Sequence, residues 1–170
     1  MSVSEITETR QYLTFKLGNE VFATDVAKVR EVLDLTPITA IPRTPDFMAG
    51  VINLRGSVVP VVDLRQCFGM TKTETTRNTC IVVVEVLLDS ESIVIGALAD
   101  SVEEVIDLDP EQIEPAPRIG AHIRTDFIRG MGKRDTQFIS ILDIDRVFST
   151  DEMAVFHAEE PGKALAEPAA

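Results

Sequence analysis

The chain contains two related copies of one segment, and this duplication limits its possible folds more than any other feature. Residues 47–68 align without a gap with residues 127–148, and KVREVLDL at 28–35 aligns with SVEEVIDL at 101–108. The matched pairs in the longer segment are Phe47–Phe127, Gly50–Gly130, Asp63–Asp143, Phe68–Phe148, Val51–Met131, Val58–Phe138, Val59–Ile139, Val62–Leu142 and Leu64–Ile144. Two copies are too few for a repeat array, which needs about three units. We therefore expect two similar β units packed against each other.

Alternation of apolar and polar residues, broken by turn residues at short intervals, predicts a protein built from many short strands. The expected strands are 11–17, 20–25, 29–35, 38–42, 48–55, 57–64, 80–88, 92–99, 102–108, 127–133 and 137–144. The polar stretch 69–78 is interpreted as the link between the copies, and the proline-bearing stretch 109–122 as a connection. Each half supplies about five strands, enough for a small closed barrel without exposed edges. The predicted fold is all-β, with two pseudo-symmetric five-stranded barrels.

Short helices are expected after the last strand of each copy. Asp63 and Asp143 stand where an aspartate side chain accepts a hydrogen bond from the first helical turn. Near the C-terminus, Ser149 and Glu152 form a plausible capping box for a helix over 151–158. The predicted architecture therefore includes two short helices and one C-terminal helix.

Composition excludes several classes of function. The net charge of −12 argues against nucleic-acid binding and against an anionic membrane surface. No run of 18 apolar residues suits a membrane span, and the N-terminus does not resemble a secretory signal, so a cytoplasmic protein without direct membrane insertion is expected. Cys67 and Cys80 lie among apolar neighbours and are interpreted as core residues rather than a disulfide.

Catalytic and metal-binding patterns are scarce. His122 and His157 lie far from any other ligand at metal spacing, and no phosphate loop or nucleophile elbow is present. The sequence therefore predicts a binding protein rather than an enzyme, with no catalytic residue, metal or cofactor. A small-molecule-binding or hydrolytic β protein remains an alternative, but its best candidates, Asp63 and Asp143, are better explained as helix caps.

Three stretches of the sequence resemble the CheW family of bacterial chemotaxis coupling proteins. They are YLTFKLGNEVFATDVAKVREV at 12–32, IPRTPDFMAGVINLRGSVVPVVDLR at 41–65 and DEMAVF at 151–156. The most specific run is G-V-x-N-L-R-G-x-x-x-P-V-x-D-L at 50–64. The resemblance covers about residues 10–158. It implies two five-stranded barrels of the Src-homology-3 type around a shared core. It also implies an adaptor between transmembrane chemoreceptors and the histidine kinase CheA, recruited to membrane receptor arrays.

The expected organisation is a single CheW-like domain over 10–158. Its two subdomains are expected at about 15–80 and 81–148, with exchange of strands between the termini allowed. Residues 1–9 and 159–170, rich in polar or in Ala, Pro and Glu residues, are expected to be disordered. An adaptor in a chemosensory-like pathway that controls surface motility or second-messenger output is the alternative function. No residue in the sequence separates the two pathways.

Arg55, at the hairpin tip Leu54-Arg55-Gly56, is the first candidate partner-binding residue. A solvated turn arginine is the ordinary interpretation, but the aligned residue in the second copy is Asp135, and a change of charge at one tip indicates specialisation. The resemblance implies that Arg55 couples receptor and kinase, and it matches Val29 and Glu31 to coupling positions as well. We expect Glu31 to lie close to Arg55.

The remaining candidates belong to a predicted groove between the barrels. Val29 and Val32 of the first copy align with Val102 and Val105 of the second, so the repeat predicts that these pairs face each other across a cleft. Core packing is the alternative for Val102 and Val105. Gly50 is a candidate too, although a β-bulge or a close backbone approach is the preferred explanation of a matched glycine and is compatible with a binding role.

Overall fold

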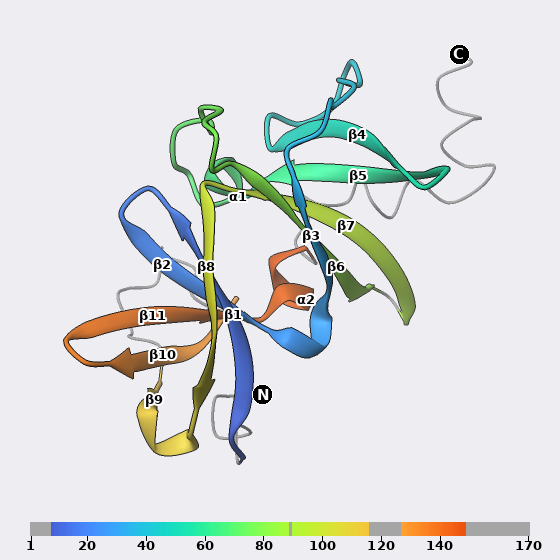
Figure 1. Cartoon of the computed structure of the whole chain (residues 1–170). Helices are drawn as coiled ribbons and strands as arrows, with labels where there is room; N and C mark the ends of the chain where they lie inside the picture. Colours follow the sequence, from blue (N-terminus) through green and yellow to red (C-terminus); the bar gives the residue numbers. More distant parts are fainter. Residues whose placement is uncertain (1–7, 89, 116–126, 149–170) are drawn as a thin grey trace.

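The structure, a computed structural model, describes residues 8–88, 90–115 and 127–148, and it folds into two β-sheets (Figure 1). One sheet has the strand order β3-β6-β7-β5-β4, with β3 Val29–Asp34, β4 Met48–Leu54, β5 Ser57–Asp63, β6 Cys80–Leu88 and β7 Glu91–Ala99. The other has the order β8-β1-β2-β11-β10-β9, with β1 Arg10–Leu17, β2 Glu20–Asp25, β8 Ser101–Leu108, β9 Ile113–Glu114, β10 Ile128–Arg134 and β11 Gln137–Leu142. The prediction of an all-β fold is confirmed.

Both sheets have the same pattern of strand pairing. In the first, the antiparallel hairpin β6–β7 is flanked by β3, antiparallel to β6, and by β5, parallel to β7; β4 then pairs with β5. In the second, β1–β2 is the hairpin, β8 pairs antiparallel with β1, β11 runs parallel to β2, and β10 pairs with β11. The sequence repeat therefore corresponds to a repeated sheet topology.

Irregularities of the two sheets fall at aligned positions. The β4–β5 pairing shifts register between Met48 and Gly50, and the β10–β11 pairing shifts between Ile128 and Gly130. The outer neighbours of these hairpins also correspond. Val51 of β4 forms a β-bridge with Thr39, and the aligned Met131 of β10 pairs with Glu114 of β9. A β-bulge redirects the strand that carries it, so equal bulges give the two units the same curvature.

The first sheet takes all its strands from residues 29–99, whereas the second combines strands from both ends of the described chain. The N-terminal hairpin β1–β2 lies in the sheet of the second copy, and β6–β7 lies in the sheet of the first. We call β3–β7 with helix α1 (Leu64–Cys67) the first unit, and β1, β2 and β8–β11 with helix α2 (Ile144–Val147) the second unit. The predicted subdomain bounds, 15–80 and 81–148, do not coincide with these sheets, because apolar alternation identifies a strand but not its partner.

The buried side chains form one cluster inside each unit and a larger cluster between the units. The cluster inside the first unit comprises Ile52, Val59, Val61, Ile81, Val83 and Leu98. The cluster inside the second comprises Tyr12, Ala23, Ile106, Leu108, Ile139 and Ile141. The central cluster draws Leu13, Phe15, Leu17, Phe47, Met48, Val62, Leu64, Cys80, Val82, Val84, Val86, Leu88, Ile95, Ala97, Ala99, Leu142, Ile144, Val147 and Phe148 from both. Burial of this shared apolar surface holds the units together.

The matched phenylalanines of the repeat contribute to this central contact. Phe68, which follows α1, stacks on Phe127 of the second unit with ring centroids 5.1 Å apart. Phe22 of β2 stacks on the other side of Phe68, at 5.5 Å, and is itself stacked on Phe15. Four rings in sequence therefore connect the two units across the interface.

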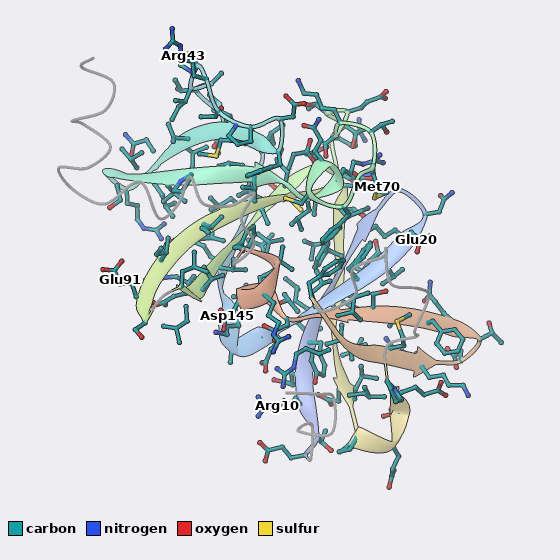
Figure 2. The ribbon with its side chains drawn as sticks, turned by 180° about the vertical axis from the view of Figure 1, so that it is seen from behind. Arg10, Glu20, Arg43, Met70, Glu91 and Asp145 are labelled. Atoms are coloured by element: carbon teal, nitrogen blue, oxygen red, sulfur yellow. The ribbon has the colours of Figure 1, made fainter. Side chains whose placement is uncertain are left out.

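Both predicted helix caps are confirmed, and the residues in the helices join the units. The Asp63 carboxylate accepts from the Arg65 backbone N–H and the Asp143 carboxylate from the Arg146 N–H. The aligned residues Arg65 and Asp145 then reach across the interface: the Arg65 guanidinium donates to Asp100 at 2.7 Å, and Asp145 accepts from the Leu87 N–H at 2.8 Å. Figure 2 labels Asp145 near the centre of the molecule.

The strand predicted at 38–42 is only a single-residue bridge at Thr39, because the flanking prolines lack the N–H groups that a longer ladder needs. The predicted connection at 109–122 contains a 3₁₀ helix, Pro110–Gln112, and the short strand β9. Its N-cap Asp109 donates its backbone N–H to the Gln112 side chain, a local pattern that the sequence analysis missed. The predicted C-terminal helix lies outside the described residues.

Candidate partner-binding site

The β4–β5 hairpin brings Arg55 against Glu31 of β3. Arg55 Nη2 and the Glu31 carboxylate form an ion pair, and Nη1 lies 3.4 Å from Glu31 Oε1. The prediction that these two side chains lie close together is confirmed. Because β3 and β4 are opposite edges of the five-stranded sheet, this pair joins the two edges of the first unit.

The tip of this hairpin has an unusual backbone. Arg55 adopts a φ of 51° and Gly56 a φ of 90°, the positive values at both central residues that characterise a type I′ turn. The Asn53 side chain accepts a hydrogen bond from the Gly56 backbone N–H at 2.8 Å. The turn presents the Arg55 side chain at the apex, where 70% of it is exposed, against 27% for Glu31. The hydrogen bond with Glu31 is the largest cause that raises the pKa of Arg55, and the negative charge of Glu31 is the second. Arg55 therefore remains positively charged.

Two exposed apolar side chains lie close in the sequence to the residues of this ion pair. Val32 follows Glu31 on β3 and is 42% exposed, while Val58 of β5 is 74% exposed. A surface that combines apolar side chains with an arginine has the composition of a protein–protein interface. We call Glu31, Val32, Arg55 and Val58 the first surface.

The second unit carries an equivalent arrangement. Glu104, aligned with Glu31, accepts from Arg134 of β10 at 2.8 Å, which again joins the two flanks of a sheet. Val105 and Phe138, aligned with Val32 and Val58, are both exposed. We call Glu104, Val105, Arg134 and Phe138 the second surface. Asp135 replaces Arg55 at the tip, but the neighbouring arginine retains the pair, so the change of charge at 135 is a shift of the arginine by one residue.

The predicted valines divide into two kinds. Val29 and Val102 are partly buried and pack against the central cluster, whereas Val32 and Val105 are exposed. Neither of the two cavities with described linings includes any of these four residues. The expectation that they face one another across one cleft therefore stays a prediction.

Gly50 has a backbone role that the structure makes explicit. Its φ is +144°, and a Cβ at this position would lie 2.8 Å from the Thr39 carbonyl carbon and clash with the attached oxygen. Both structural explanations offered for this glycine, a bulge and a close backbone approach, are confirmed. Its contribution to partner binding stays a prediction.

The cavity beside Asp63, a candidate residue of the small-molecule or hydrolytic alternative, gives little support to catalysis. It has a volume of about 620 Å³ and includes Asp63 in its lining. That carboxylate is buried and already accepts from Arg65 N, Thr73 N and Thr73 Oγ1. Across the described ranges, no three His, Cys, Asp or Glu side chains are arranged to hold a metal ion. The Asp63 side chain therefore serves as a helix cap that also fastens the linker.

Sequence reasoning missed Arg134, Val58 and Phe138 as residues of these surfaces, and it missed Asn53 as a residue that bonds to the first hairpin turn. Val58 and Val59 are adjacent in a strand, so they cannot both face the interior, and this rule alone predicts one exposed valine. Arg134 precedes the aligned tip position by one residue, so a gapless alignment pairs it with Leu54. The one-residue shift of the arginine is recognised only from the structure, in which Arg134 pairs with Glu104.

Two fused β units with exposed apolar and charged surfaces, built around a common core, define a protein interaction module. Comparisons with known proteins agree. A family model for the CheW-like domain matches residues 11–152, so the chain belongs to the CheW-like domain family. Chemotaxis protein CheW of Klebsiella aerogenes is 36% identical over 146 residues, which cover 86% of each chain. Chemotaxis protein CheW of Thermotoga maritima is 29% identical over 140 residues, covering 81% of this chain and 86% of the relative.

A solved structure is similar in fold as well. The scaffolding protein TtCheW from Thermoanaerobacter tengcongensis matches with a TM-score of 0.73 and 34% identity, over 84% of this chain and 94% of that chain. The two β units therefore have the Src-homology-3-like architecture expected from the sequence. Among the residues that the structure describes, no helix is long and apolar enough to cross a bilayer.

Proposed function

We propose that this chain is a non-catalytic adaptor that links transmembrane chemoreceptors to the histidine kinase CheA. The observation that carries the proposal is the match of residues 11–152 to the CheW-like domain. Relatives over most of that length are named chemotaxis proteins, and the similar solved structure is titled a scaffolding protein. In this role the chain works in the cytoplasm and is recruited to receptor arrays at the membrane.

The two equivalent surfaces support a bridging role. A bridge needs two surfaces that can be occupied together, and the first and second surfaces belong to different sheets. Each includes a solvent-exposed arginine and two exposed apolar side chains, and arginine is enriched among the residues that dominate interface energies. Partners with an apolar centre and a polar rim match this composition. Coupling roles for Val29, Gly50, Val102 and Val105 remain part of the proposal.

Binding measurements with Arg55→Ala test the proposal directly. The partners are the receptor's cytoplasmic tip and the regulatory domain of CheA from the same organism, with kinase activity measured in receptor-containing membranes. Wild type should bind both and couple them. Because Arg55 is exposed, the variant should keep its folding stability within about 0.5 kcal/mol. It should lose about thirtyfold or more in affinity for at least one partner, the effect of removing a dominant contact.

Arg77→Ala serves as the matched control, since Arg77 is an exposed arginine in the linker, outside both surfaces. It should behave as wild type in binding and in kinase coupling. A wild-type chain that binds neither partner would refute the adaptor proposal. Normal coupling by a well-folded Arg55→Ala variant would instead remove Arg55 from the binding site.

Val32→Asp distinguishes the two partners. A receptor tip is expected to be a helical hairpin, which places apolar anchors in a groove. A charge at the exposed Val32 position should leave the circular dichroism unchanged and weaken receptor binding far more than kinase binding. Equal loss of both partners would show that Val32 does not belong to a receptor-specific surface.

A further inference from the structure

The two units place their arginines differently, although both form an ion pair with an aligned glutamate. Arg134 is the last residue of β10, so extended backbone presents its guanidinium to Glu104. Arg55 lies one position further along, inside the turn, with a φ of 51°. The first unit therefore presents its arginine at the apex, with a side chain 70% exposed, whereas the Arg134 side chain is 44% exposed.

Presenting an arginine inside this turn has a conformational cost. Left-handed backbone is unfavourable for a residue with a Cβ, and type I′ turns strongly prefer Asn, Asp or Gly at both central positions. Gly56, with a φ of 90°, satisfies the preference at the second position, and Arg55 violates it at the first. Some other interaction must therefore hold the turn in the form that directs Arg55 toward Glu31.

Asn53 supplies such an interaction. In a two-residue hairpin the ladder pairs Leu54 with Ser57, so the Gly56 N–H has no partner within the ladder. The Asn53 side-chain oxygen accepts that N–H at 2.8 Å and spans the turn from its N-terminal side. At the aligned position the second unit has Lys133, which has no acceptor atom in its side chain. The second unit needs none, because its arginine lies outside the turn.

We propose that Asn53 is a positioning residue: by holding the β4–β5 turn through the Gly56 N–H, it orients Arg55 toward Glu31. Asn53 fixes the arginine at the apex for a partner without touching that partner itself. The structural half of this inference is independent of any partner, and its consequence for binding rests on the proposed function.

The partner-independent test follows the Arg55 Nε–Hε signal in ¹H–¹⁵N spectra, assigned by its disappearance in Arg55→Ala. Glu31→Gln gives the position of the signal without the charged partner. Asn53→Ala should move the signal toward the Glu31→Gln position. Asn53→Asp, which retains an acceptor oxygen, should keep it near its wild-type position. Lys133→Ala, the aligned change in the second unit, should leave it unmoved. An unchanged signal in Asn53→Ala would overturn the inference.

The binding test is a double-mutant cycle between Asn53 and Arg55, measured as affinity for whichever partner Arg55→Ala weakens. Loss of one hydrogen bond changes an equilibrium constant by about three- to tenfold, so Asn53→Ala alone should lower the binding affinity by about that factor. In an Arg55→Ala background the same change should have no further effect. Asn53→Asp should restore wild-type affinity.

The outcomes separate the two proposals. Equal weakening by Asn53→Ala in both backgrounds would show that Asn53 contacts the partner itself, which contradicts a positioning role. If wild type binds neither partner, the adaptor proposal fails, while the spectra still decide whether Asn53 orients Arg55. Asn53 is exposed, so all variants should retain the wild-type circular dichroism and melting temperature within a few degrees.

Discussion

Replacing Gly50 with alanine is the most discriminating perturbation of the fold, because its backbone environment leaves no room for a Cβ. The φ of +144° belongs to a region that only glycine adopts readily. The clash of the added methyl group is with the Thr39 carbonyl, a backbone group that cannot rotate away. That carbonyl accepts from the Val51 N–H, and the Thr39 N–H donates to the Val51 carbonyl, both at 2.9 Å.

The expected loss follows from these two effects. Backbone strain at Gly50 contributes about 2 kcal/mol, and loss of the two Thr39–Val51 hydrogen bonds adds about 1 kcal/mol each. Gly50→Ala should therefore lower the free energy of unfolding by about 4 kcal/mol. Gly56→Ala is the matched control: its φ is also positive, but no atom lies within 4 Å of the added Cβ. Strain alone should cost about 1–2 kcal/mol there.

Urea unfolding followed by circular dichroism measures both variants. Typical domains have 5–15 kcal/mol of stability, so Gly50→Ala should still fold at low temperature. Partner binding is then measured under conditions where both variants are fully folded. Equal losses of stability at Gly50 and Gly56 would refute the close-approach argument. A stable Gly50→Ala variant that fails to bind would assign the glycine to the interface instead.

Two further predictions concern carboxylates that accept several hydrogen bonds or cap a helix. Burial raises the pKa of Asp100, but the hydrogen bonds from Arg65 and Gly18 N–H outweigh it and leave the pKa below its ordinary value of 3.8. The ionised Asp100 therefore stabilises the folded protein above pH 3.8, and this contribution is lost as the pH falls through the lowered folded-state pKa. Asp100→Asn should lower the free energy of unfolding at pH 7 and make little difference near pH 2, as measured by urea unfolding. Asp63→Ala should cost about 2–4 kcal/mol, because three donors lose a buried charged acceptor. Asp143→Ala should cost only about 1 kcal/mol as an ordinary cap, and equal losses in thermal melting would contradict this asymmetry.

Much of the fold could be predicted from local pattern and from the repeat. Asp63 and Asp143 cap their helices because the position of an aspartate before an apolar turn is a local signal. Gly50 and Gly130 lie at aligned register shifts, and Gly50 has a positive φ that few other residues adopt. These features depend on neighbours in the sequence, which is why reading the chain along its length detects them.

Exchange of strands between the subdomains is allowed by the sequence, but which hairpins are exchanged could not be predicted in the same way. β1–β2 and β6–β7 are hairpins with strong local signals, but each also pairs on one side with a parallel strand, β11 for β2 and β5 for β7. Parallel pairing leaves no turn between the partners to reveal it. Long-range burial of the central cluster decides the pairing, and that depends on the whole sequence.

The two copies carry different residues at their hairpin tips, and this bears on how the chain can bind. Residues that shape the backbone, such as Gly50 and the capping aspartates, agree between the copies because both sheets need the same bulge and the same helix start. Asn53, Arg55 and Gly56 correspond to Lys133, Asp135 and Thr136, so the first tip presents arginine where the second presents aspartate. A partner that requires a positive charge at the apex can use only the first unit. The duplication therefore supplies the same sheet topology twice, and the tip residues place opposite charges at the first turn position of the two hairpins.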